Sequence, residues 1–243
     1  MAITPEKLQL FVHYLCPYAQ RALYTLAYKG IQCEIIEVDL TKKPSWFLEV
    51  NPLGQVPAAR VIQSGKEYHI CESINVSEYF DSFPGPPLYP RLPNGTVNPI
   101  EKTLVDLNIR QVSDAATQNL ATYYKGFGTP EQILVTRKLL KNLDKILENR
   151  GFLMTKILGK NELTLSDIVL LPMVERLHAL KDGAWRELVD GEDLSNLWFW
   201  FENLIEQPWG QAMRADPRRI AKWIIGRRSP EYKGLSLPLT NYD

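Results

Sequence analysis

The first forty residues alternate short apolar runs with one amphipathic segment. Residues 8–13 and 33–39 are short, rich in β-branched and aromatic side chains, and bounded by breakers, which is typical of strands. Between them, residues 17–29 carry an apolar face at helical spacing, with Gln20 and Arg21 off that face, and Gly30 follows as a C-cap. The pattern predicts a strand–helix–strand unit whose two strands run parallel.

A second pattern of strands follows. Residues 56–62 and 67–71 have strand composition and are separated by a Ser64-Gly65 turn, which predicts a hairpin. Residues 73–83 form a short helical segment after it. Together with the first unit, this predicts an α/β domain over residues 1–83.

The pattern changes after residue 83. Residues 84–99 contain six prolines and two glycines, a density that sustains neither a helix nor a central strand, so we expect a linker there. Beyond it no strand signal remains. Apolar spacing near 3.6 predicts an all-α helical bundle over residues 100–243, with helices at 101–124, 131–150, 164–181 and 195–207.

The third of these helices begins with a recognisable cap. Thr164-Leu165-Ser166-Asp167 places a hydroxyl three residues before a carboxylate, ahead of an apolar run. This is the pattern of a capping box with Asp in the usual Glu position. We interpret it as structural.

Composition narrows the function classes. The 243 residues are 45% hydrophobic and 23% charged, with a formal net charge of zero, so we expect neither nucleic acid nor an anionic membrane as a partner. We find no export signal at the start and no apolar stretch near the ~20 residues of a membrane span, which predicts a cytoplasmic protein. Three cysteines are too few for a secreted disulfide framework.

Cys16 is the most informative residue, because it stands where the first strand ends and the first helix begins. Unpaired backbone N–H groups and the helix dipole stabilise a thiolate there, and such cysteines have pKa values of about 3.5–7.5 instead of ~8.5. Pro17 fits the first helical turn. The alternative is an inert, half-buried cysteine, but the strand–Cys-Pro–helix context favours a reactive one.

The residue three positions after Cys16 is Ala19, so an intrahelical disulfide of the Cys-x-x-Cys kind cannot form. Cys33 and Cys71 lie in predicted strands and are interpreted as packing residues. A resolving thiol must therefore come from outside, and a small-molecule thiol is the natural second reactant.

The chain resembles the glutathione transferases, specifically the omega class, which have a thioredoxin-like N-terminal domain and an all-helical C-terminal domain. The resemblance covers essentially the whole chain, and its N-terminal motifs are the more specific ones. These N-terminal motifs are Cys16-Pro17-Tyr18-Ala19-Gln20-Arg21, Lys43-Pro44-Ser45-Trp46-Phe47, residues 51–57 and Glu72-Ser73. The weaker matches further along the chain are Val174-Glu175-Arg176-Leu177 and Ser229-Pro230-Glu231.

For the reacting end of glutathione, the resemblance implies four residues. Cys16 is the catalytic thiol, which forms a mixed disulfide with glutathione, and Tyr18 belongs to the glutathione-binding set. Pro57 resembles the cis-proline of the family, which exposes the backbone of Val56 to the cysteinyl part of the tripeptide.

The resemblance also assigns the charged ends of glutathione and the acceptor pocket. Glu72 and Ser73, which open a helix, receive the γ-glutamyl end, with Ser73 holding its carboxylate and Glu72 its ammonium. Lys43 corresponds to the lysine that meets the glycyl carboxylate. Arg176 and Trp223 resemble residues that line the acceptor pocket.

The resemblance implies a thiol transferase and dehydroascorbate reductase with glutathione as co-substrate, a role in detoxification and a homodimer. S-(phenacyl)glutathiones and methylated arsenicals are further acceptors of this class. We predict no metal, because the three histidines show no ligand spacing. The alternatives are a lambda-like or glutathionyl-hydroquinone reductase, and a non-enzymatic interaction module on the same scaffold.

Overall fold

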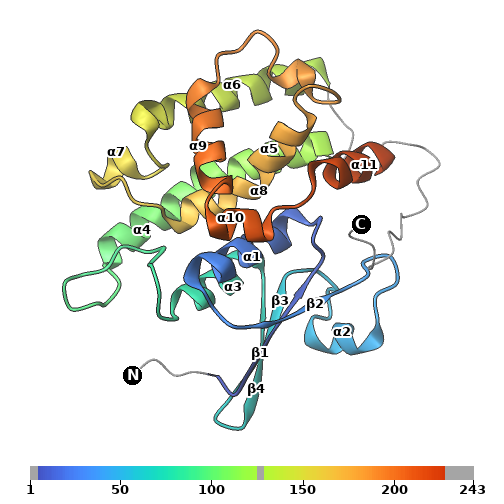
Figure 1. Cartoon of the computed structure of the whole chain (residues 1–243), viewed down its shortest axis with the longest axis vertical. Helices are drawn as coiled ribbons and strands as arrows, with labels where there is room; N and C mark the ends of the chain where they lie inside the picture. The colour runs from blue at the N-terminus through green and yellow to red at the C-terminus, as the bar shows by residue number, and fades with distance from the viewer. Residues whose placement is uncertain (1–4, 125–128, 228–243) are drawn as a thin grey trace. The chain divides into compact units, whose positions relative to one another are not determined.

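The computed structural model describes residues 5–124 and 129–227 (Figure 1). Within them the chain forms two compact units, the first ending at Pro86 and the second starting at Pro87. The predicted fold class is confirmed, because the first unit combines a sheet with helices and the second is helical. The Ser229-Pro230-Glu231 motif lies outside the described residues.

The first unit is built around a four-stranded sheet with strand order β2-β1-β3-β4. The first two strands are parallel, as the strand–helix–strand pattern predicted, and the other two neighbouring pairs are antiparallel. Its elements are β1 (Lys7–Val12), α1 (Pro17–Lys29), β2 (Glu34–Glu37), α2 (Ser45–Val50), β3 (Ala58–Gln63), β4 (Lys66–Cys71) and α3 (Ser73–Asp81).

The two faces of this sheet differ in character. Leu8, Leu10 and Val12 alternate along β1 toward one face, where each is buried. α3 contacts β3 and β4 and packs along α1. Phe11 points to the other face, where its ring meets two aromatic side chains of α2, with centroid distances of 5.7 and 5.8 Å. α2 therefore covers only part of the second face.

Side chains of α1 that the helical pattern placed away from the apolar face are buried, contrary to expectation. Arg21 is only 2% exposed, because α3 packs along α1 and its Ser73 contacts the guanidinium, and Gln20 is fully buried as well. At the end of α1, Lys29 forms a buried ion pair with Asp81 of α3, with 3.2 Å between Nζ and Oδ1. These contacts fix α1 against α3.

Sequence pattern missed α2 altogether. Six residues after Pro44 are too few for a periodic signal, and the helix is held by the aromatic contacts of Trp46 and Phe47 with Phe11. The hairpin is confirmed, although its first strand begins at Ala58, two residues later than predicted.

The second unit is helical as predicted, but the bounds of its helices differ from the predicted ones. The segment predicted as one helix at 101–124 is α4 (Pro99–Asn108), a π-helical turn (Ile109–Ser113) and α5 (Asp114–Tyr124). The short last helices were not predicted, although Ile220, Trp223 and Ile224 stand at helical spacing in the final one. The remaining elements are α6 (Pro130–Ile146), a 3-10 turn (Glu148–Arg150), α7 (Thr155–Leu158), α8 (Leu165–Leu180), a 3-10 turn (Arg186–Leu188), α9 (Ser195–Ile205), α10 (Pro208–Met213) and α11 (Pro217–Arg227).

The cap predicted at the start of α8 is confirmed. Both the backbone N–H and the hydroxyl of Thr164 donate to Asp167 Oδ2 at 3.0 Å. The other carboxylate oxygen accepts from the Leu153 N–H and from Trp200 Nε1, also at 3.0 Å. Burial raises the pKa of the Asp167 carboxyl, and these hydrogen bonds oppose that shift. The cap thus ties α8 to α9.

In the part of the chain that the structure describes, no helix is both long and apolar enough to cross a membrane.

Candidate active site

Cys16 lies at the junction that the sequence predicted. Its backbone is extended and its N–H donates to His13 O at 2.8 Å, which closes the turn after β1. Pro17 follows as the first helical residue, and Cys16 O accepts the first helical hydrogen bond, from Gln20. Cys16 is partly exposed as a residue and lies at a helix N-terminus.

The Cys16 thiol faces the loop that joins α2 to β3. Cys16 Sγ lies 3.7 Å from the carbonyl oxygen of Val56. The peptide bond between Val56 and Pro57 is cis, as the resemblance implied. Pro57 starts the approach to β3, and both residues are buried. The predicted thiol and two of the predicted glutathione-binding residues therefore come together from segments forty residues apart.

Asn51 braces this loop from within, a role that the sequence did not reveal. The side chain is buried; its Nδ2 donates to Gln55 O at 2.8 Å and its Oδ1 accepts from the Leu53 N–H at 3.2 Å. The Lys43 side chain lies against Gly54 of the same loop. A Cβ added at Gly54 would come within 3.0 Å of Lys43 Nζ, so a larger residue there would crowd the lysine. The loop thus holds the exposed Lys43 beside it.

The start of α3 carries the other predicted pair. Glu72 is exposed and has a φ of 71°, an unusual conformation for a residue with a side chain. Ser73 opens the helix and is buried, with its Oγ accepting from Arg21 Nη1 at 3.2 Å. The guanidinium of Arg21 also lies 4.9 Å from the ring centroid of Tyr18, a half-exposed residue of the predicted set. Arg21 therefore connects two predicted site residues.

Arg21 is the charged group that sequence reasoning missed. It follows Cys16 by five residues within the recognised motif, so its presence was visible, but its burial was not. A buried guanidinium beneath Ser73 adds positive charge near the N-terminus of α3. This arrangement suits the binding of a carboxylate.

The other two cysteines are chemically different from a reactive thiol. Burial, and secondarily the neighbouring Glu34 carboxylate, raises the pKa of Cys33 to about 12. Burial and Glu72 also raise the pKa of Cys71. Both thiols therefore stay neutral near pH 7 and are poor nucleophiles.

The two residues that the resemblance assigned to the acceptor pocket lie in the second unit. Arg176 of α8 is fully buried, with Nη1 donating to Pro172 O at 2.6 Å and lying 3.7 Å from Glu175 Oε2. Trp223 of α11 is also buried, and α11 packs on α8. Among the described residues, no three His, Cys, Asp or Glu side chains group as a metal site requires.

Comparisons with known proteins agree with this arrangement. The family model of the glutathione S-transferase N-terminal domain matches residues 15–82. Mouse glutathione S-transferase omega-1 is 30% identical over 96% of this chain and 88% of its own length. The crystal structure of glutathione transferase Omega 1C from Trametes versicolor superposes with a TM-score of 0.73, at 20% identity, over 92% of this chain and 97% of that one.

A rice transferase, GST1, solved in complex with glutathione, superposes with a TM-score of 0.74 at 19% identity, over 96% of this chain and the whole of that one. Both solved structures share the fold of this chain. The match with mouse glutathione S-transferase omega-1 spans most of both chains. The chain therefore belongs to the glutathione transferase family, and within it resembles the omega class.

Proposed function

We propose that this glutathione transferase is a thiol transferase and dehydroascorbate reductase that works through a mixed disulfide between Cys16 and glutathione. The observation that carries the proposal is the placement of Cys16. Its thiol lies at the N-terminus of α1, partly exposed and 3.7 Å from Val56 O. A thiol in that place reacts covalently, whereas a tyrosine or serine hydroxyl only hydrogen-bonds the sulfur of bound glutathione.

Glutathione fits the surroundings of Cys16 as an extended tripeptide. The backbone of Val56 pairs with its cysteinyl residue, which brings the glutathione sulfur to Cys16. Ser73 and the N-terminus of α3 receive the γ-glutamyl carboxylate, and the exposed Glu72 carboxylate receives the γ-glutamyl ammonium. Support for this part comes from Arg21, whose guanidinium holds Ser73 Oγ and adds positive charge.

The other two contacts complete the ligand. Lys43 is exposed beside the loop and pairs with the glycyl carboxylate. Tyr18, in the first turn of α1, lines the same site. Each end of the tripeptide thereby meets a group of opposite charge.

Two displacements make up the reaction with a glutathione mixed disulfide. In the first, the Cys16 thiolate attacks the glutathione sulfur; the Cys16–glutathione bond forms, and the substrate leaves as its thiol after taking a proton. In the second, the thiolate of another glutathione attacks this disulfide, which yields glutathione disulfide and regenerates the Cys16 thiolate. With dehydroascorbate, two glutathione molecules supply the two electrons and two protons that form ascorbate.

By its resemblance to the omega class, the chain should bind the acceptor in a pocket near Arg176 and Trp223, which are themselves buried. S-(phenacyl)glutathiones and methylated arsenicals are further acceptors to assay. We propose that the protein works in the cytoplasm as a homodimer and needs no metal. Conjugation of glutathione to aromatic halides should be weak, because the site is built for exchange at Cys16.

Steady-state kinetics combined with a binding assay test the proposal. The wild-type chain should bind immobilised glutathione and give parallel double-reciprocal plots with a glutathione mixed disulfide, as two displacements require. Cys16→Ala should still bind glutathione but lose transfer. Binding without transfer in the wild type would favour a non-enzymatic module, and transfer retained by Cys16→Ala would exclude this mechanism. Preference for glutathionyl hydroquinones would favour the lambda-like alternative.

A further inference from the structure

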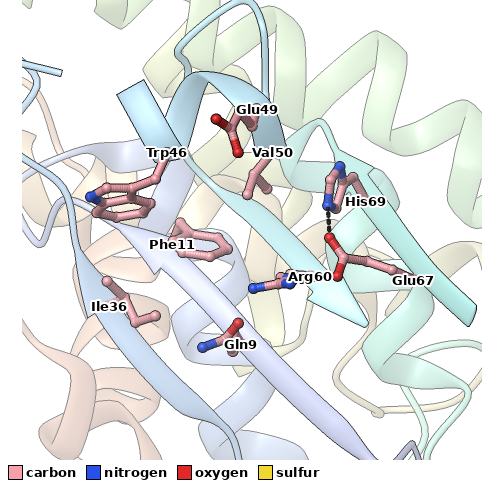
Figure 2. Close-up of a pocket in the computed structure, with 9 residues that line it drawn as sticks. All are labelled: Gln9, Phe11, Ile36, Trp46, Glu49, Val50, Arg60, Glu67 and His69. Atoms are coloured by element: carbon pink, nitrogen blue, oxygen red, sulfur yellow. Dashed lines mark hydrogen bonds and ion pairs between the residues drawn. The ribbon is translucent and has the colours of Figure 1, made fainter. Parts of the chain in front are cut away.

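We propose that the face of the sheet beneath α2 carries a second ligand site, which binds a planar heteroaromatic lactam through Gln9 and Arg60. A lactam is a ring amide whose N–H and C=O lie side by side. The site is formed entirely by the first unit and uses none of the residues assigned to glutathione (Figure 2). The proposal stands independently of the function of Cys16.

A cavity of about 330 Å³ lies between α2 and the strands. Its apolar side consists of Phe11 and Ile36 from the sheet and of Trp46 and Val50 from α2. The rings of Phe11 and Trp46 are tilted by 44° with centroids 5.7 Å apart, and Trp46 is 45% exposed. Flat aromatic molecules favour such walls, since they bury ring area against both side chains.

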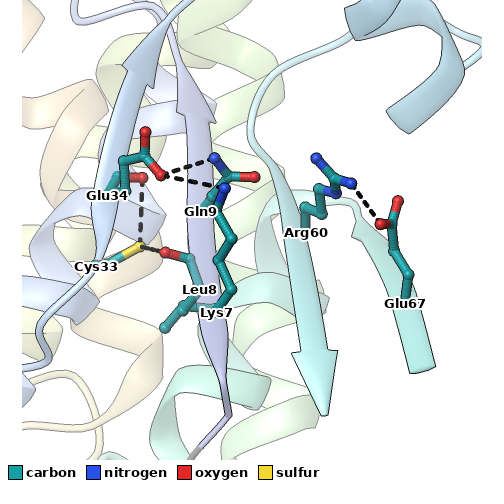
Figure 3. Close-up of polar contacts among 7 residues, drawn as sticks. All are labelled: Lys7, Leu8, Gln9, Cys33, Glu34, Arg60 and Glu67. Carbon is teal, nitrogen blue, oxygen red and sulfur yellow. Dashed lines mark hydrogen bonds and ion pairs between the residues drawn. The ribbon is translucent and has the colours of Figure 1, made fainter. Parts of the chain in front are cut away.

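The polar side of the cavity is a row of cross-strand neighbours. In the register of the sheet, Glu34 faces Gln9, Gln9 faces Arg60, and Arg60 faces His69. Their side chains therefore share one face, with directly opposite residues only about 5 Å apart at Cβ. Gln9 and Arg60 are the central pair of this row and lie on the two inner strands (Figure 3).

Gln9 presents an acceptor to the cavity. Its Nε2 donates to Glu34 Oε2 at 2.7 Å, and a carboxylate can only accept, so the orientation of the amide is fixed. Lys7 Nζ lies 3.9 Å from the same oxygen and favours the charged form of Glu34. Gln9 is only 5% exposed, and its Oε1 has no hydrogen-bond partner among the described residues.

Arg60 presents the matching donor. Its Nη2 is paired with Glu67 Oε2, and Glu67 Oε1 is held in turn by His69 Nε2 at 2.8 Å. The Arg60 hydrogen bond lowers the pKa of Glu67, so the pair stays charged and fixes the guanidinium. Arg60 Nε is buried and has no hydrogen-bond partner within the described residues. One fixed donor and one fixed acceptor thus lie unused beside the aromatic wall.

These two atoms define the chemistry of the ligand. Arg60 Nε needs a hydrogen-bond acceptor and Gln9 Oε1 needs a donor. The carbonyl oxygen and the N–H group of one lactam supply both. An anionic carboxylate has no proton to give Gln9 and would meet the negative charges of Glu34, Glu49 and Glu67. A buried polar group without a partner is unfavourable, and a neutral lactam satisfies both atoms.

Quinolin-2-one and its N-methyl derivative test this assignment, because they differ only in the N–H group. Calorimetry should detect saturable binding of quinolin-2-one, with the N-methyl compound roughly 3–10-fold weaker, as expected for one neutral hydrogen bond. In Gln9→Leu the two affinities should become equal, since the acceptor is gone. Cys16→Ala should bind quinolin-2-one like the wild type, which separates this site from the proposed chemistry.

Gln32→Leu is the matched control, because Gln32 is an exposed glutamine just before β2 and does not line the cavity. It should leave both affinities unchanged. Arg60→Lys keeps a charge for Glu67 but lacks Nε, and should weaken quinolin-2-one by a similar factor. Thermal melts confirm that each variant is folded. The proposal is overturned if no saturable binding occurs, if N-methylation has no effect, or if folded Gln9→Leu still discriminates the two compounds.

Discussion

The N-termini of α8 and α1 share one physical property, their attraction for negative charge, but differ in what it is used for. α8 begins with Thr164 and Asp167, whose carboxylate accepts four hydrogen bonds and is fully buried. α1 begins with Cys16, which makes no side-chain cap hydrogen bond and stays partly exposed. A helix N-terminus stabilises a nearby anion in either case. The buried Asp167 carboxylate, with all its bonds made, stabilises the fold, whereas we expect the partly exposed Cys16 to be available for reaction.

The largest expected effect is the loss of chemistry at the start of α1. Cys16→Ala should lower thiol transfer at least about a thousand-fold, as removal of a nucleophile does in other enzymes. The free energy of unfolding should change by no more than about 1 kcal/mol, because a small, partly exposed side chain is replaced by a smaller one. Cys33→Ala should retain full activity. Equal losses in both variants would mean that Cys16 is not the nucleophile.

Asp167→Ala should have the opposite profile. The variant leaves four buried hydrogen-bond donors without their acceptor. The free energy of unfolding, measured by denaturant titration, should therefore fall by about 3–5 kcal/mol. Activity per folded molecule should persist. Asp193→Ala is the control: among the described residues the exposed Asp193 side chain accepts only the Ser195 N–H, at 3.1 Å, so the variant should lose about 1 kcal/mol or less. Similar losses in the two variants would contradict this account of the cap.

A third helix start, that of α3, distinguishes binding from reaction. Ser73→Ala should raise the KM for glutathione by roughly 10–100-fold, since hydrogen bonds to a charged group contribute about 1.5–3 kcal/mol, while kcat changes less. Ser77→Ala is matched to it: Ser77 lies one turn further along α3, is buried, and its Oγ has no hydrogen-bond partner among the described residues. A KM that moves equally in both variants would exclude a specific role for Ser73.

The smallest effect is expected at Lys43. Because exposed ion pairs contribute about 0.2–1 kcal/mol, Lys43→Ala should raise the KM for glutathione only about two- to five-fold, and added salt should reduce the difference from wild type. The adjacent, equally exposed Lys42 is the control, and Lys42→Ala should bind glutathione normally. If Lys42→Ala has the larger effect, the wrong lysine has been assigned.

The sequence pattern correctly predicted the features that depend on residues near one another in the chain. The strand–helix–strand unit, the hairpin, the cap of α8 and the position of Cys16 all depend on residues close together in the chain. Resemblance added the cis peptide bond before Pro57. These features needed no knowledge of tertiary packing.

The remainder depends on packing between distant segments. Arg21 is a residue type usually found on a solvated helix face, and here the packing of α3 along α1 buries it beneath Ser73. Gln9 and Arg60 become neighbours only through the register of β1 with β3. Asn51 braces a loop through bonds that any short polar residue in a turn could make. A single sequence carries no periodic signal for any of these.

Mass spectrometry after exposure to glutathione disulfide tests the central claim, that Cys16 is the reactive thiol. Near neutral pH we predict a single adduct of about 305 Da, glutathione less one hydrogen, which maps to Cys16 and is absent from Cys16→Ala. Cys33 and Cys71 should stay unmodified, because burial raises the pKa of both and their thiolates form only at alkaline pH, for Cys33 near 12. An unmodified Cys16, or an adduct on Cys33 or Cys71 instead, would contradict the account.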